Sequence, residues 1–189
     1  MKATIKIASL MAALLMLQGC VAAVVAGAAG TAVVANDRRT LGAYIDDQSI
    51  ELKITGFISS DEELRTKTHI SAVSVNGNVL LVGQAPSEEM RDKVVDAAQK
   101  VPGVQKINNQ IRLMNPTSLS TRTHDSWLTS VIKGKLLTSD VDSSAIKVTT
   151  ENSEVFLMGL VSHKEGNEAA EVARNVAGVT RVIKVFQYE

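Results

Sequence analysis

The sequence contains few of the residues on which catalytic and metal sites usually depend. Its single cysteine, Cys20, rules out a disulfide within the chain. The three histidines have no HxH, HExxH or Cys/His spacing; they are His69, His124 and His163. No GxSxG motif and no phosphate-binding glycine loop occurs either. We therefore expect no catalytic residues, no metal, no cofactor and no enzymatic activity.

An excess of charge of either sign is also missing. The 20 basic and 20 acidic residues cancel. Removing Lys2 and Lys6 with the N-terminal segment leaves 18 basic and 20 acidic residues, a net charge near −2. Because nonspecific binding of nucleic acid requires a basic surface, no nucleic-acid partner is expected.

The N-terminus carries the signals of an exported lipoprotein. Lys2 and Lys6 precede an apolar run from Ile7 to Leu17, which is typical of a secretory signal peptide and too short to span a membrane. The following Leu17-Gln18-Gly19-Cys20 resembles a bacterial lipobox, in which the cysteine becomes the diacylated first residue of the mature chain. This predicts a signal peptide at residues 1–19 and lipidation of Cys20, which leaves no cysteine for thiol catalysis.

Residues 20–45 are predicted to form an acylated N-terminus and a flexible tether. A second membrane span is the alternative for the segment from Val21 to Ala35, but this segment is short, and Gly27 and Gly30 would interrupt its helix. Val21, rather than aspartate, follows the cysteine. By resemblance to sorted bacterial lipoproteins, this favours a lipid anchor in the outer membrane, facing the periplasm.

The rest of the chain contains one unit twice. The segment from Ser74 to Gly83 returns as Thr150 to Gly159, an offset of 159 − 83 = 76 residues, and Val101 to Val104 returns as Val176 to Val179. Such a repeat indicates two copies of one supersecondary unit. We therefore predict two small domains and a linker; their ranges are 46–113, 124–189 and 114–123.

Each copy shows the pattern helix, strand, strand, helix, strand. In the first copy Asp46 or Asp47 is expected to cap a helix, Asn76-Gly77 predicts a tight hairpin turn, and Gly103 suits a helix C-terminus. The predicted elements of the second copy are a helix at 125–137, strands at 146–150 and 155–158, a helix at 164–176 and a strand at 179–188. The fold class is thus α+β, with a small three-stranded mixed sheet packed against two helices in each unit.

This pattern of a hairpin, a strand ending in glycine, an amphipathic helix and Gly-Val before a last strand resembles the BON domain. The likeness is densest from Asp125 to Gly159, and it covers nearly all of the chain beyond the signal peptide. It implies two αββαβ domains on a periplasm-facing outer-membrane lipoprotein. It also implies that the second domain binds anionic phospholipid.

The first helices of the two copies differ in an informative way. At an offset of 78 residues the apolar positions agree; Ile50, Ile54 and Ile58 match Leu128, Ile132 and Leu136, which is the pattern of a shared core. Elsewhere Ser49 becomes Trp127, Lys53 becomes Val131 and Ser59 becomes Leu137. At helical spacing a second stripe forms away from the core; its members are Trp127, Ser130, Gly134 and Leu137, with Lys133 and Lys135 at its sides.

We interpret this stripe as a lipid-binding face. Tryptophan favours the boundary between headgroups and acyl chains, and lysines attract anionic headgroups. The predicted site residues are Trp127, Val131, Lys133, Gly134, Lys135 and Leu137, and the predicted ligand is an anionic phospholipid such as phosphatidylglycerol. Trp127 also matches the lipid-facing position that the BON resemblance implies.

Three alternatives remain open. Trp127 could pack into a seam between the domains or under the linker. The stripe could instead bind an envelope protein, which would make the chain an adaptor. A haemolysin is a weaker possibility, because no pore-forming segment supports it.

Overall fold

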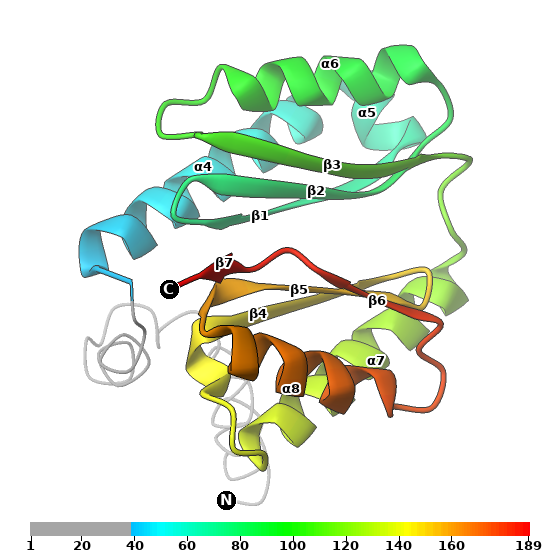
Figure 1. The fold of residues 1–189 in the computed structure, drawn as a ribbon. Helices are drawn as coiled ribbons and strands as arrows, with labels where there is room; N and C mark the ends of the chain where they lie inside the picture. Colours follow the sequence, from blue (N-terminus) through cyan, green and yellow to red (C-terminus); the bar gives the residue numbers. More distant parts are fainter. Residues whose placement is uncertain (1–38) are drawn as a thin grey trace, which may run out of the picture. The chain divides into compact units, whose positions relative to one another are not determined.

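The computed structural model describes residues 39–189, so the predicted signal peptide, Cys20 and most of the predicted tether lie outside the described residues. The described chain forms two units built in the same order (Figure 1). The elements of the first unit are α4 (Leu41–Ser60), α5 (Glu62–Lys67), β1 (His69–Val75), β2 (Asn78–Ala85), α6 (Glu88–Gln99) and β3 (Lys106–Leu113). Those of the second unit are α7 (Leu119–Leu137), a short 3-10 helix at Ser143–Ala145, β4 (Ile146–Glu151), β5 (Glu154–Val161), α8 (His163–Arg174), β6 (Arg181–Lys184) and β7 (Gln187–Tyr188).

The expected α+β fold with small mixed sheets is confirmed. In the first unit β2 lies between β1, to which it is antiparallel, and β3, to which it is parallel. The second unit repeats this arrangement with β5 between β4 and β6. Two long helices cover one face of each sheet, α4 and α6 in the first unit and α7 and α8 in the second (Figure 1).

Several boundaries differ from those expected. The helix α4 begins at Leu41 and is capped by Thr40, not by Asp46 or Asp47, so the end of the predicted tether is helical. The helix α7 begins at Leu119, inside the predicted linker, with Ser118 as its cap. The hydroxyl-rich sequence after Pro116 suggested a linker, but these residues supply an N-cap and a first turn instead.

The third strand of the second unit is also different, because it is broken. The segment β6 pairs with Glu154 to Leu157, and the two-residue β7 pairs farther along β5 with Leu160 and Val161. Between them, Phe186 turns its ring towards α8, where it contacts Gly166. Additionally, the short helix α5 was not predicted from the sequence.

The two sheets pack on each other through the faces that their helices do not cover. Alternate residues of β2 and β5 point to opposite sides of their sheets. Val79 and Leu81 face the helices of their own unit, whereas Leu80 and Val82 join a second cluster. The buried members of this seam cluster are Val75, Leu80, Val82, Phe156 and Met158. The continuous apolar runs of β2 and β5 therefore reflect strands that are buried on both faces.

Hydrogen bonds surround the apolar seam. Lys147 on β4 donates to Glu51 Oε1 at 2.7 Å and to the carbonyl of Ser74 at 2.9 Å. The fully buried Gln84 donates to Glu151 Oε1 at 2.7 Å and accepts from the amide of Thr117 at 3.2 Å. Such buried polar groups fix one arrangement, because any shift would leave them unpaired.

A buried aspartate holds the hairpin turn in each unit. The carboxylate of Asp47 accepts the amides of Asn76 and Gly77 at 2.8 and 3.0 Å, and Asp125 accepts those of Asn152 and Ser153, both at 2.8 Å. The two aspartates occupy the same position in the repeat, since 125 − 47 = 78. They are not helix caps; each ties the first helix of its unit to the turn between the first two strands.

None of the described helices is both long and apolar enough to cross a membrane. The same residues contain no group of three or more histidine, cysteine, aspartate or glutamate side chains that could hold a metal ion.

The clamp by Asp47 is testable. Its carboxylate also pairs with Arg39 at 2.8 Å and accepts from the Ser74 hydroxyl at 2.6 Å. We expect Asp47→Ala to lower the free energy of unfolding by about 3 kcal/mol, because the substitution leaves several buried donors without an acceptor. The exposed neighbour provides the control: Asp46→Ala should change stability by less than about 0.5 kcal/mol. Urea unfolding of both variants measures this, and equal effects would contradict the clamp.

Candidate functional site

The helix α7 turns one side to the core and leaves the opposite side open. Its buried side carries Leu128, Ile132 and Leu136, which pack on β4, β5 and α8. Asp125 lies on the same side, where it holds the hairpin turn. These contacts fix the rotation of the helix about its own axis, so the residues on its other side must face away from the unit.

The outer side of α7 presents large apolar side chains to solvent. Trp127 is 52% exposed and Leu137 is 73% exposed. Gly134 lies between them in the stripe, and a Cβ atom added to it would meet no atom within 4 Å. The stripe is therefore open where the glycine stands, and the tryptophan projects from one end of it.

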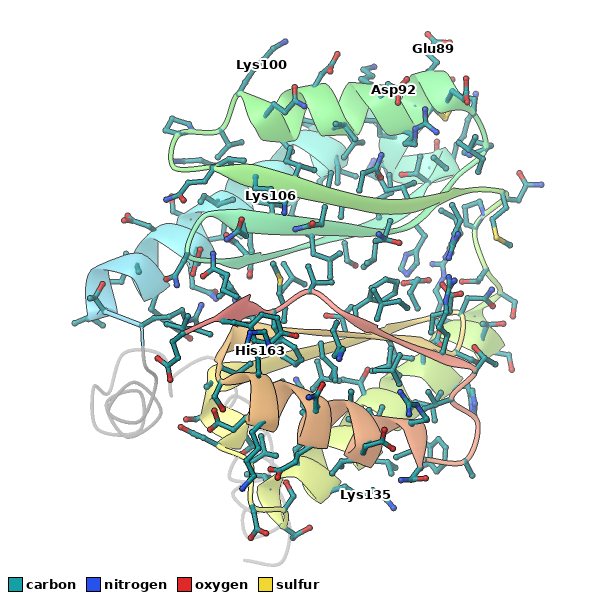
Figure 2. All side chains as sticks on the ribbon, viewed as in Figure 1. Glu89, Asp92, Lys100, Lys106, Lys135 and His163 are labelled. Carbon is teal, nitrogen blue, oxygen red and sulfur yellow. The ribbon has the colours of Figure 1, made fainter. Side chains whose placement is uncertain are left out.

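Lysines border this apolar surface. Lys133 and Lys135 are exposed, and the ammonium group of neither forms a hydrogen bond or an ion pair with the described residues. Figure 2 shows Lys135 projecting outward from α7. An unpaired, mobile ammonium group beside an apolar surface can approach a separate anion without breaking an existing contact.

The structure adds two residues that sequence reasoning missed. Leu119, in the first turn of α7, is 79% exposed and lies on the same flank as Leu137, because eighteen residues make five helical turns. It was missed because the helix was expected to start at Asp125. The ring of His124 stacks on Trp127 with centroids 5.5 Å apart, which supports the indole in one orientation.

One predicted site residue is placed differently. Val131 is partly buried and packs against the core of its unit, so it forms the base of the surface rather than its exposed part. Trp127, by contrast, is absent from the seam cluster. The structure therefore places Trp127 at the surface and not in the seam between the domains.

The matching helix of the first unit is also partly apolar on its outer side. Leu41, Ile45 and Leu52 of α4 are 58%, 58% and 71% exposed. The apolar character is thus common to both helices. What α7 has in addition is the tryptophan and two lysines, Lys133 and Lys135, at positions where α4 carries Thr55 and Phe57.

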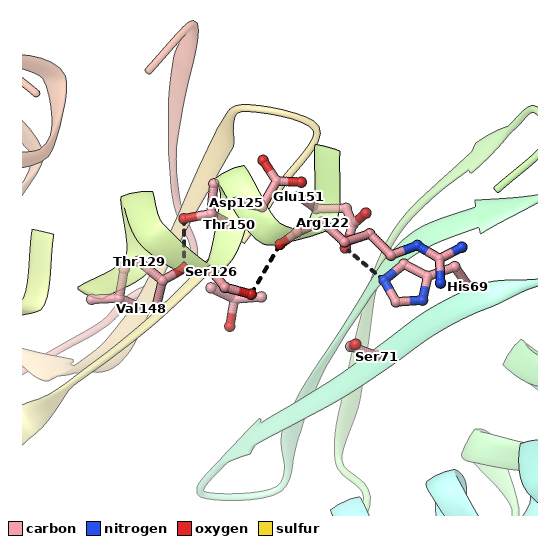
Figure 3. Close-up of a pocket in the computed structure, with 10 residues that line it drawn as sticks. His69, Ser71, Arg122, Asp125, Ser126, Thr129, Val148, Thr150 and Glu151 are labelled. Atoms are coloured by element: carbon pink, nitrogen blue, oxygen red, sulfur yellow. Dashed lines mark hydrogen bonds and ion pairs between the residues drawn. The ribbon is translucent and has the colours of Figure 1, made fainter. Parts of the chain in front are cut away.

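A polar pocket of about 390 Å³ lies on the inner side of α7 (Figure 3). His69 and Ser71 of β1 line it from one unit, and Arg122 of α7 and Glu151 of β4 line it from the other. The His69 Nε2 and Glu151 Oε2 atoms are 3.7 Å apart. Ser71 donates no hydrogen bond to His69 among the described residues.

Burial shifts the pKa values of two groups in this pocket. Burial lowers the pKa of the His69 imidazole, and the Arg122 guanidinium lowers it further, so the ring is neutral at pH 7. Burial raises the pKa of the Glu151 carboxyl, although the hydrogen bond from Gln84 opposes this shift. The contact between His69 and Glu151 is therefore not an ion pair at neutral pH.

Comparison with known proteins identifies both units. The BON domain matches residues 46–115 and 124–189. The chain belongs to the BON domain family. The outer membrane lipoprotein DolP of Haemophilus influenzae is 41% identical over 97% of this chain and 95% of its own. This relationship confirms an outer-membrane lipoprotein held by a lipid anchor, with two BON domains.

Other similarities are less informative. The 21 kDa hemolysin of Actinobacillus pleuropneumoniae is 42% identical over 80% of this chain and 79% of its own. Both relatives carry names of lipoproteins or haemolysins rather than of enzymes. A structure of CdsD, a structural protein of the type III secretion system of Chlamydia trachomatis, aligns at 17% identity and a TM-score of 0.30. That alignment covers 76% of this chain and 63% of CdsD, and the low TM-score supports no argument.

The raised pKa of Glu151 gives the seam between the BON domains a predictable dependence on pH. Protonation of a carboxyl with a raised folded-state pKa favours folding; this contribution is complete below the unfolded-state pKa and is lost as the pH rises through the folded-state value. Glu151→Gln removes the ionisation, and its amide can still accept from Gln84. We expect the wild type to gain stability relative to the variant as the pH falls from about 8 to about 4.

Urea unfolding of both proteins across this range measures the difference. The lowered pKa of His69 acts in the opposite sense, because its contribution is lost as the pH falls through the folded-state pKa, but it is present in both proteins and largely cancels. A stability difference that does not change with pH would contradict a buried, ionising Glu151.

Proposed function

We propose that this chain is a noncatalytic lipoprotein that binds anionic phospholipid through α7 of its second BON domain and thereby supports the integrity of the outer membrane. The observation that carries the proposal is the exposed surface of Trp127 and Leu137, open at Gly134 and bordered by two unpaired lysines. An isolated exposed leucine is ordinary on a protein surface, whereas an exposed tryptophan, leucines and lysines on one helix side suit a membrane interface.

The chemistry of the surface favours lipid headgroups of negative charge. Tryptophan places an apolar body among acyl chains and keeps its N–H near the headgroups. Each lysine near an anionic membrane surface contributes about 1 kcal/mol. Lys133 and Lys135 would therefore select phosphatidylglycerol-like lipids over neutral ones, while Trp127, Leu137 and Leu119 enter the headgroup boundary.

The N-terminal anchor supports weak binding by a small surface. Acylation at Cys20 would hold the chain at the membrane, so that docking of α7 becomes an intramolecular step with a high effective concentration. A surface of a few side chains then suffices, although it would bind only weakly from solution.

The inner pocket does not favour an enzyme. Its only histidine has a carboxylate neighbour but no activated nucleophile, and its hydroxyl groups largely bond within the fold: Thr129 donates to Thr150 at 2.8 Å and Ser126 to the carbonyl of Arg122 at 2.9 Å. We propose that this pocket belongs to the structural seam.

A charge introduced at the centre of the surface tests the proposal. We expect Trp127→Glu to weaken binding of a fragment of residues 38–189, which form one compact unit, to phosphatidylglycerol vesicles by more than about tenfold. The substitution removes apolar burial and places a carboxylate against an anionic membrane. Co-sedimentation at low and high salt measures the binding, and thermal unfolding followed by circular dichroism checks the fold.

Two matched controls test whether vesicle binding is specific to the outer side of α7. Ser49→Glu occupies the corresponding position in the first unit, and Leu52→Glu changes an exposed apolar residue on the outer side of α4. Neither should affect vesicle binding.

If Trp127→Glu sediments like the wild type, the lipid site lies elsewhere. If it binds a protein partner less well but lipid equally, α7 is the surface of an adaptor. Binding that ignores salt would exclude Lys133 and Lys135 from the interaction.

A further inference from the structure

The edge of the first sheet differs from the matching edge of the second. The strand β3 pairs with β2 without interruption over eight residues, from Lys106 opposite Asn78 to Leu113 opposite Ala85. Among the described strands β2 is its only partner, so its other edge is unpaired. In the second unit the corresponding edge is broken between β6 and β7. The repeat thus keeps one continuous free edge and interrupts the other.

The backbone groups of β3 that face outward can be identified. The amides of Lys106 and Met114 bond to Gly77 and Ala85 on the β2 side. Because alternate residues of a strand direct their backbone groups to opposite sides, the even-numbered residues face β2 and the odd-numbered ones face outward. The amide of Ile111 confirms this, since it donates to Asn109 Oδ1 at 3.0 Å and not to a carbonyl of β2. The outward backbone groups of residues 107, 109 and 113 have no such partner among the described residues.

The side chains beside this edge form a cationic cleft. The even-numbered residues of β3 point towards the second unit, and a cleft of about 260 Å³ opens there. It is lined by Lys106 and Lys184, by the carboxamides of Asn78, Asn108, Gln110 and Gln187, and by no carboxylate. The Lys184 ammonium group donates to the neutral Asn167 side chain at 2.9 Å, and the Lys106 ammonium group has no hydrogen bond or ion pair with the described residues. Lys106 is labelled on β3 in Figure 2.

We propose that β3 is a docking edge for an extended polypeptide segment that carries carboxylates. The segment would add to the sheet as a fourth strand, bonding through the outward backbone groups of β3. Its alternate side chains would point into the cleft, where an acidic residue meets Lys106 and Lys184 and polar groups meet the carboxamides. This site is separate from the outer side of α7, so it does not depend on the proposed lipid binding.

The charges of the edge argue for this occupant over a second copy of the chain. Two antiparallel β3 strands would bring Lys106 of one copy close to Arg112 of the other, and like charges opposite each other disfavour pairing. Arg112 is partly neutralised by Glu154, with a separation of 3.0 Å, but Arg181 shares the same carboxylate at 2.5 Å. The basic end at Lys106 therefore selects a segment of opposite charge.

A synthetic peptide tests the docking edge directly. The probe is an eight-residue peptide of alternating glutamate and valine, blocked at both ends and labelled with a fluorophore, and its match has lysine in place of glutamate. The full chain is held in an uncharged detergent, and fluorescence anisotropy measures binding. We expect the glutamate peptide to bind saturably and about tenfold more tightly than the lysine peptide.

Three variants separate strand pairing from simple attraction of an anion. Asn109→Pro removes an outward amide without touching the ladder to β2, and it should weaken binding about tenfold. Asn109→Ala is its control; it keeps that amide, frees the amide of Ile111, and should bind as well as the wild type or better. Lys106→Glu changes an exposed side chain, and it should reverse the preference between the two peptides.

Each possible result either supports or overturns the docking of a peptide on β3. The proposal would be overturned by a lack of saturable binding or by equal binding of the two peptides. Unchanged binding by Asn109→Pro would also overturn it, because the peptide would then bind to the lysines as an anion without adding a strand to the sheet. Circular dichroism melting confirms that each variant is folded. Trp127→Glu should leave peptide binding unchanged, so a failure of the lipid proposal and a failure of this one give different results.

Discussion

Two sheets that are apolar on both faces must cover each other, and this requirement determines where the four long helices of the described residues lie. Leu80, Val82, Phe156 and Met158 point away from the helices of their own units and meet in the seam. Burying each such side chain stabilises the fold by about 1.5–3 kcal/mol, so an arrangement that exposed them would be strongly disfavoured. The helices are thereby confined to the outside, where one side of each remains in solvent.

The outer side of α7 is thus exposed because the two sheets pack on each other at the seam and leave the helices on the outside. Its rotation is fixed by Leu128, Ile132 and Leu136 in the core and by Asp125 at the hairpin turn. The same positions are fixed in α4 by equivalent residues, including Asp47. The scaffold is common to both BON domains, whereas the outer sides of the two helices differ, among other positions, at Trp127, Lys133 and Lys135. The proposed lipid binding rests on these differences.

The sequence predicted the parts of the fold that depend on local patterns. The tight turn at Asn76-Gly77, where both residues have positive φ, follows from short-range rules, and the core positions of α4 and α7 follow from helical spacing. Five of the six predicted lipid-site residues also lie on the outer side of α7. The exception, Val131, packs partly into the core because it lies near the edge of the stripe, where a small rotation of the helix decides its burial.

What the sequence did not predict depends on contacts between distant residues. Lys147 and Glu51 are 96 positions apart, and Gln84 and Glu151 are 67 apart, so no local pattern could pair them. The role of Asp47 was mistaken for helix capping because capping and turn-holding both place an acidic residue early in a helix. Leu119 and the free edge of β3 became visible only when the true start of α7 and the sheet order were known.

The fluorescence of Trp127 reports whether α7 meets the lipid, because Trp127 is the only tryptophan in the chain. The fragment of residues 38–189 would be mixed with phosphatidylglycerol vesicles that contain brominated lipids, and with phosphatidylcholine vesicles of the same kind. We expect a blue shift of the emission and quenching by bromine in the phosphatidylglycerol vesicles alone, because the indole leaves water for the headgroup boundary. A fragment that sediments with those vesicles while its emission keeps the same wavelength and intensity would contradict the claim that α7 meets the lipid.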